Sequence, residues 1–63
     1  MTTVKEQDAK QRILAAATEL FSQKGFDATG VSEIAKEAQV NKALIYYYFE
    51  NKEAILDSLI DAM

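Results

Sequence analysis

The chain has 63 residues and a formal net charge of −3, so it holds one small domain. It contains no cysteine and no histidine, which excludes disulfides, nearly excludes a structural zinc site and removes the imidazole or thiol that most nucleophilic catalytic sites need. Its two glycines form no phosphate-binding pattern such as G-x-G-x-x-G. We therefore expect neither an enzyme nor a cofactor-binding site in this segment.

The rest of the composition, 49% hydrophobic and 27% charged, is typical of a soluble globular protein. No apolar run approaches the roughly 20 residues of a membrane span, and the N-terminus has no signal-peptide pattern, so we expect a cytoplasmic location and no membrane partner. The charge is uneven, because residues 50–63 carry the whole −3 and residues 1–49 are balanced. The net acidity therefore does not exclude a nucleic-acid partner for residues 1–49.

The first predicted element is a helix over residues 8–24, with Asp8 as its N-cap. Its apolar positions recur with the helical period: Ile13, Ala17, Leu20 and Phe21. Gly25 suits the left-handed position that ends many helices, and Phe26 would then contact the last turn. Residues 1–7 are expected to form a flexible tail.

Two short helices are expected next, separated by a turn at Gln39. Thr29 is the expected cap of a helix over residues 30–38, whose apolar positions again follow the helical period: Val31, Ile34, Ala35 and Ala38. Asn41 is a good N-cap for a helix over residues 42–49. This last segment is rich in β-forming residues, but a lone strand would have no partner in the chain, and helix is therefore favoured.

Asn51 is expected to cap a fourth helix, which runs to the end of the sequence over residues 51–63. Its apolar stripe comprises Ile55, Leu56, Leu59, Ile60 and Met63. This is more apolar surface than residues 8–49 can cover, and the isolated 63-residue chain is therefore expected to be marginally stable or to self-associate. One reading of the chain is thus a small helical protein-protein interaction module that uses residues 55–63.

The helix over residues 42–49 has two distinct faces when its side chains are projected at 100° per residue. One arc is apolar and comprises Leu44, Ile45, Tyr48 and Phe49. The other arc comprises Lys42, Ala43, Tyr46 and Tyr47. Lysine can contact guanine or a phosphate, and tyrosine hydroxyls can donate to phosphate oxygens, as in a helix that enters the major groove. Periodicity alone equally allows Tyr46 and Tyr47 to be ordinary half-buried aromatics.

A set of matching positions extends from about residue 8 to residue 60: Arg12-Ile13-Leu14, Ala16-Ala17, Leu20-Phe21, Gly25-Phe26, Thr29, Ile34-Ala35, Ala38, Val40, Ile45-Tyr46, Tyr48-Phe49, Lys52-Glu53 and Ile55. This set resembles the N-terminal domain of tetracycline-repressor-like (TetR family) transcriptional regulators. The resemblance implies an all-α, homeodomain-like fold: a three-helix helix-turn-helix DNA-binding domain over residues 8–49, followed by the first part of a fourth helix.

The resemblance also implies what surrounds this domain in the whole protein. A C-terminal domain would dimerise and bind a small-molecule inducer, and part of the stripe over residues 55–63 would dock on it. The partner would be double-stranded DNA with a palindromic operator, bound by a bacterial, nucleoid-associated repressor that responds to its ligand.

Carried over position by position, the resemblance implies two sets of DNA contacts. The base-reading residues would be Lys42, Ala43 and Tyr47. The phosphate contacts would come from Thr29, Asn41, Tyr46 and Lys52. Plain helix capping by Thr29 and Asn41, and a solvated surface role for Lys52, are the alternatives.

Four positions depart from the family pattern. Asn41 replaces a frequent serine, which leaves capping intact. Gln39 stands where a glycine is common, and a non-glycine residue at positive φ there costs about 1–2 kcal/mol. Ala43 replaces a frequent glycine and adds a methyl group that can touch a thymine methyl. Tyr48 is often histidine in relatives, and because it falls on the apolar arc we expect it to pack.

Overall fold

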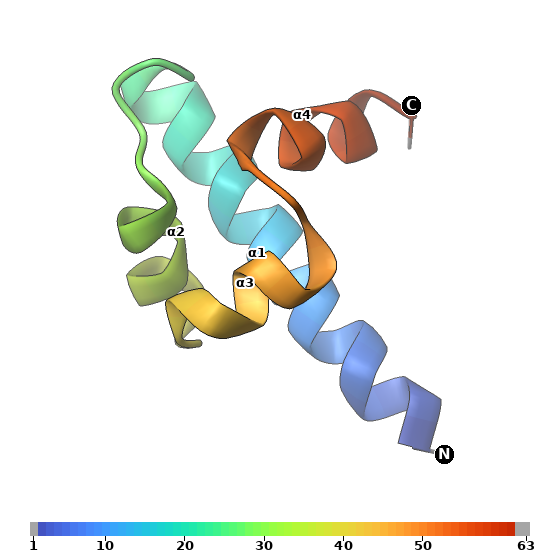
Figure 1. Cartoon of the computed structure of the whole chain (residues 1–63). Coiled ribbons are helices and arrows are strands. Elements are labelled where there is room, and N and C mark those ends of the chain that lie inside the picture. The colour runs from blue at the N-terminus through green and yellow to red at the C-terminus, as the bar shows by residue number, and fades with distance from the viewer. Residues whose placement is uncertain (1, 62–63) are drawn as a thin grey trace.

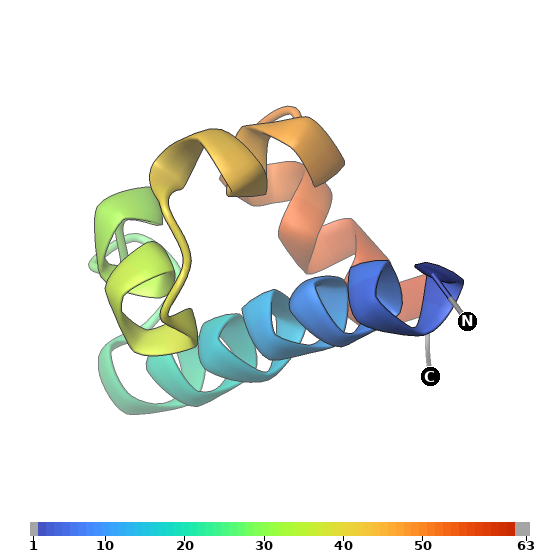
Figure 2. The same cartoon turned by 90° about the horizontal axis from the view of Figure 1, so that it is seen from below.

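The computed structural model describes the backbone of residues 2–61 and the side chains of residues 8–61. Over this range the chain is all-α, as expected, and forms four helices (Figure 1): α1 (Thr2–Lys24), α2 (Val31–Ala38), α3 (Lys42–Tyr48) and α4 (Lys52–Asp61). The long helix α1 contacts each of the other three, which arch over one side of it (Figure 2). None of these helices has the length and apolar character that crossing a membrane requires.

Helix α1 begins earlier than the sequence predicts. It starts at Thr2, so the helix start predicted at Asp8 and the tail predicted over residues 1–7 are wrong for the described part of that segment. Nothing between Thr2 and Asp8 is a glycine or proline, and the segment includes the good helix formers Lys5 and Glu6. Asp8 instead lies within the helix, where its carboxylate is 3.9 Å from the guanidinium of Arg12, one turn further on.

The predicted end of α1 is confirmed. Gly25 has φ 89°, and its N–H donates to the carbonyl of Phe21 at 2.9 Å, which is the left-handed helix stop. The accompanying apolar contact is also present, because the rings of Phe21 and Phe26 lie 5.2 Å apart. The chain therefore turns sharply after Lys24 toward α2.

The start of α2 differs from the prediction by one residue. The N-cap is Gly30, in an extended conformation, and the carboxylate of Glu33 accepts its N–H at 3.1 Å. Thr29 does not cap the helix because its side chain is buried, with 1% of its surface exposed. Glu33 thus closes the first turn of α2 from within the helix.

The turn between α2 and α3 has the positive φ predicted at Gln39, which adopts φ 62° and ψ 43°. The N–H of Gln39 donates to the carbonyl of Lys36 at 3.2 Å, and the N–H of Val40 donates to Ala35 at 3.0 Å. This pair of bonds is a Schellman motif, which ends α2 and redirects the chain within two residues. Only residues 39–41 therefore separate α2 from α3.

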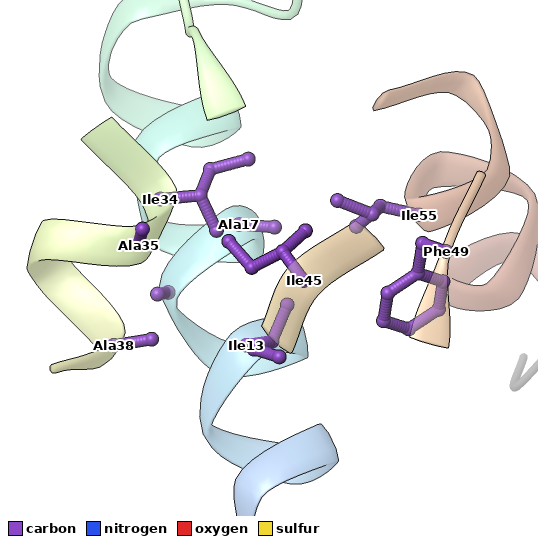
Figure 3. Packing of buried hydrophobic residues seen from close by; sticks show 9 residues of the cluster. Ile13, Ala17, Ile34, Ala35, Ala38, Ile45, Phe49 and Ile55 are labelled. Atoms are coloured by element: carbon purple, nitrogen blue, oxygen red, sulfur yellow. The ribbon is translucent and has the colours of Figure 1, made fainter. Parts of the chain in front are cut away.

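Residues from all four helices and from the extended Phe49 after α3 share one apolar core (Figure 3). Its buried members are Ile13, Ala16, Ala17, Ile34, Ala35, Ala38, Ile45, Phe49 and Ile55. Alanines supply the buried surface where α1 and α2 cross, and small side chains let the two backbones approach closely. Ile45 packs from α3 among α1 and α2 residues, so α3 is docked by one face.

Helix α4 is only partly covered by the core. Asn51 caps it as predicted, since Oδ1 accepts the N–H of Ala54 at 2.8 Å. Ile55 is fully buried and Leu59 packs against the core, whereas Ile60 is 58% exposed. The predicted stripe therefore divides into a docked part and an exposed part, and its last member, Met63, lies outside the described residues.

Candidate nucleic-acid interface

The candidate interface is the solvent-facing side of α3. Tyr46 and Tyr47 are 50% and 74% exposed, whereas Ile45, on the face of α3 that packs into the core, is 1% exposed. Lys42 and Ala43 are also exposed. The two arcs projected from the sequence are thus confirmed, because both tyrosines lie on the exposed side of α3 and neither belongs to the core.

Tyr47 is supported from behind by Tyr48. The two rings meet edge to face, with their centroids 5.1 Å apart and an angle of 80° between the planes. Tyr48 is half-buried and packs against the core, as predicted for a residue on the apolar arc. The exposed Tyr47 ring therefore rests on a residue that is fixed by the fold.

The start of α3 is fixed by Asn41, whose side-chain Oδ1 accepts the N–H of Leu44 at 2.8 Å. The predicted cap is therefore confirmed. Capping uses Oδ1, so the Nδ2 group of the same side chain can still donate to a phosphate. Lys42 is the first residue of α3 and is exposed, which puts an ammonium group at the leading end of this helix.

Thr29 does not belong to this surface. Its hydroxyl donates to the carbonyls of Gly25 at 2.8 Å and Leu20 at 3.3 Å, and the residue is buried. The expectation that this hydroxyl contacts a phosphate is corrected: it satisfies carbonyls at the end of α1. A threonine before a helix gives the same sequence signal for a cap as for such an internal bond.

Lys52 is partly buried and its ammonium bonds within the domain, so it is not a freely solvated surface lysine. Its Nζ donates to the carbonyls of Phe26 at 2.6 Å and Thr29 at 2.9 Å, and lies 4.2 Å from the centre of the Phe26 ring. These contacts tie the start of α4 to the connection between α1 and α2. A phosphate contact by Lys52 would have to use its third proton.

Arg12 is a residue whose role the sequence did not reveal. Its Nη2 donates to the carbonyls of Ala38 at 2.8 Å and Gln39 at 3.2 Å, at the turn before α3. The sequence around Arg12 indicates only an ordinary ion pair with Asp8, one helical turn away. The one sequence feature that pointed to its second role was the expected strain at Gln39, because a strained turn needs hydrogen bonds from elsewhere in the fold.

The N-terminal end of α2, opposite the end that Arg12 contacts, is joined to α1 by an ion pair. Lys24 bonds the carboxylate of Glu33, and this bond, followed by the N–H of Gly30, lowers the pKa of Glu33 below its ordinary value. The pair is exposed to solvent, so its contribution to stability is small. It secures the first turn of α2 to the end of α1.

The structure thus separates the predicted site residues into two groups. Lys42, Ala43, Tyr46 and Tyr47 share the exposed side of α3, next to Asn41. Thr29 and Lys52 contact each other at the α1–α2 connection instead. Within the part of the chain that the structure describes, no three Asp, Glu, His or Cys residues come together as metal ligands.

The family profile described as "Bacterial regulatory proteins, tetR family" matches residues 13–59. The chain is 43% identical over 54 residues to the uncharacterized HTH-type transcriptional regulator YuxN of Bacillus subtilis (strain 168), an alignment that covers 86% of this chain and 19% of YuxN. It is 49% identical over 51 residues to the probable HTH-type transcriptional regulator YttP of the same organism, covering 81% of this chain and 25% of YttP.

A third relative is the biofilm operon icaADBC HTH-type negative transcriptional regulator IcaR of Staphylococcus aureus (strain Newman), 39% identical over 51 residues, with 81% of this chain and 27% of IcaR covered. The chain therefore spans between 19% and 27% of the length of these relatives. The matched segment contains the helix-turn-helix and the start of α4 described above. The chain belongs to the tetR family of bacterial regulatory proteins.

Proposed function

We propose that this chain binds double-stranded DNA in a sequence-specific manner, as the DNA-binding domain of a transcriptional regulator. The observation that carries the proposal is the exposed side of α3, with Lys42, Ala43, Tyr46 and Tyr47, on a short helix that only three residues separate from α2. Its relatives support the proposal, since they are named as HTH-type transcriptional regulators.

In this proposal α3 lies in the major groove. The ammonium of Lys42, at the leading end of α3, reaches guanine O6 and N7, because residues at the start of a recognition helix are those that contact base edges. Ala43 keeps the approach close and its methyl group can touch a thymine methyl. Tyr46 donates its hydroxyl to a phosphate, and Tyr47, which is more exposed, extends further toward the bases.

We further propose that the whole protein is a homodimeric, ligand-responsive repressor acting on a palindromic operator. The relatives are several times longer than this chain, which leaves room for a C-terminal domain that dimerises and binds an inducer. The exposed Ile60 and the half-exposed Leu56 on α4 fit a surface that such a domain covers. Repression is supported by IcaR, which is named as a negative regulator. Its place would be the bacterial cytoplasm, at the nucleoid.

A salt titration tests the DNA-binding proposal. The protein as its gene encodes it is mixed with a fluorescent random duplex, and anisotropy is followed as salt is raised. DNA binding predicts that the logarithm of affinity falls linearly with the logarithm of salt, with a slope of about −0.9 for each phosphate neutralised. A protein-protein interaction module acting through residues 55–63 predicts no duplex binding, and that result would refute the proposal.

A further inference from the structure

One nitrogen atom of Arg12 contacts both sides of the strained residue in the helix-turn-helix. Nη2 donates to the carbonyl of Ala38, which precedes Gln39, and to the carbonyl of Gln39 itself. The other terminal nitrogen, Nη1, lies 3.9 Å from the carboxylate of Asp8. The guanidinium is thus oriented by its own helix α1 and joined to the turn in front of α3.

The two carbonyls reach the same nitrogen because of the conformation at Gln39. The φ and ψ of that residue, 62° and 43°, set the direction in which the chain leaves α2, and so the place of the Gln39 carbonyl relative to the guanidinium on α1. A change to another backbone conformation would move this carbonyl away from Nη2. The left-handed conformation is unfavourable for glutamine by about 1–2 kcal/mol. Hydrogen bonds from a charged donor are strong enough to offset an energy of this size.

The Schellman bonds of this turn leave these two carbonyls for another partner. Those bonds occupy the carbonyls of Ala35 and Lys36, and Arg12 bonds the carbonyls of Ala38 and Gln39 further along the chain. Cationic side chains are also favoured at the C-terminal end of a helix, where the carbonyls carry partial negative charge. Arg12 therefore matches the end of α2 in geometry and in charge.

We propose that Arg12 is a positioning residue for DNA recognition: by holding Gln39 in the left-handed conformation, it fixes the angle between α2 and α3 and so the aim of the base-reading side chains. This inference rests on the proposed function. A helix that tilts about the turn still meets phosphates by charge, but its side chains no longer align with base edges. Arg12 therefore acts on discrimination between sequences rather than on general affinity.

The test uses the protein as its gene encodes it and two duplexes. One is enriched from a random library by the wild type, and the other is a scrambled version of equal length and composition. We expect Arg12→Met to weaken binding to the enriched duplex by about tenfold or more, the scale of one lost base contact, and binding to the scrambled duplex by less than about twofold. The salt slope should stay unchanged.

Two further variants separate positioning from other roles. Lys24→Met removes one positive charge and one α1–α2 contact at the opposite end of α2, and it should leave the ratio between the two affinities as in the wild type. Arg12→Met combined with Gln39→Gly should recover discrimination, because glycine adopts the left-handed conformation without help. Circular dichroism confirms that each variant is folded at the assay temperature.

The outcomes are distinct. If Arg12→Met lowers both affinities equally and reduces the salt slope by about 1, Arg12 is a phosphate contact and the proposal is overturned. If discrimination does not return with Gln39→Gly, the turn is not what Arg12 controls. If Arg12→Met alone does not fold, the double variant decides: it should discriminate like the wild type. Failure of the wild type to enrich any duplex would refute the proposed function instead.

Discussion

Replacing Gln39 by glycine should make the domain more stable. The φ of 62° places the Cβ of Gln39 close to the backbone, at a cost of roughly 1–2 kcal/mol that glycine avoids. Glycine also gains freedom in the unfolded chain, which removes roughly 0.4–1 kcal/mol of that benefit. The hydrogen bonds of the turn use only backbone atoms of residue 39, so they persist. The expected net gain is about 0.5–1 kcal/mol.

Urea denaturation followed by far-UV circular dichroism measures this gain, at a concentration where sedimentation shows one species. For a domain of this size the same gain raises the melting temperature by roughly 2–8 °C. Gln11→Gly is the matched control, because Gln11 is exposed within α1 and glycine there should lower stability by about 0.5–1 kcal/mol. A loss at Gln39 similar to that at Gln11 would show that the residue has an ordinary negative φ in solution.

Lys42→Ala should narrow the ratio between affinities for the enriched and scrambled duplexes, because a base contact costs about 1–3 kcal/mol on the right sequence alone. Anisotropy with both duplexes measures it, and an equal loss on both would make Lys42 a backbone contact. Lys52→Met should lower the free energy of unfolding by about 1–3 kcal/mol, since two carbonyls lose a charged donor. An unchanged urea midpoint would contradict this. Finally, folding lowers the pKa of Glu33, so the ionised carboxylate stabilises the folded state at neutral pH. This stabilisation is lost as the pH falls through the lowered pKa. Glu33→Gln should therefore lose less stability on acidification than the wild type, as read from melting temperatures against pH; parallel profiles would refute this.

Features set by local sequence were predictable from the chain. Gly25, Asn41 and Asn51 mark helix ends through interactions with residues three or four positions away, and the structure shows these interactions where the pattern placed them. The two faces of α3 follow from helical periodicity. The positive φ of Gln39 was expected from the glycine common there in the family that the chain resembles, rather than from the local pattern.

Features set by contacts between distant segments were not predictable. Thr29 carries the signal of a helix cap, but burial beside α1 decides which carbonyls its hydroxyl meets. The partners of Lys52 are 23 and 26 residues away, and those of Arg12 are 26 and 27 residues away. The start of α1 was mistaken for a different reason, since Asp8 fits both a cap and a pair with Arg12.

The bonds from Lys52 to the carbonyls of Phe26 and Thr29 determine where this domain can be joined to another protein. Hybrid regulators are made by exchanging segments at a chosen crossover, and the connection between α3 and α4 is the obvious choice because it lies directly after the helix proposed to read DNA. A crossover there would take Lys52 and the fully buried Ile55 from a foreign sequence, although both complete the native domain. A crossover after Leu59 keeps both residues in their own domain. The exposed Ile60 then comes from the second protein, together with the surface of that protein that covers it. The transplantable unit is therefore longer than its helix-turn-helix.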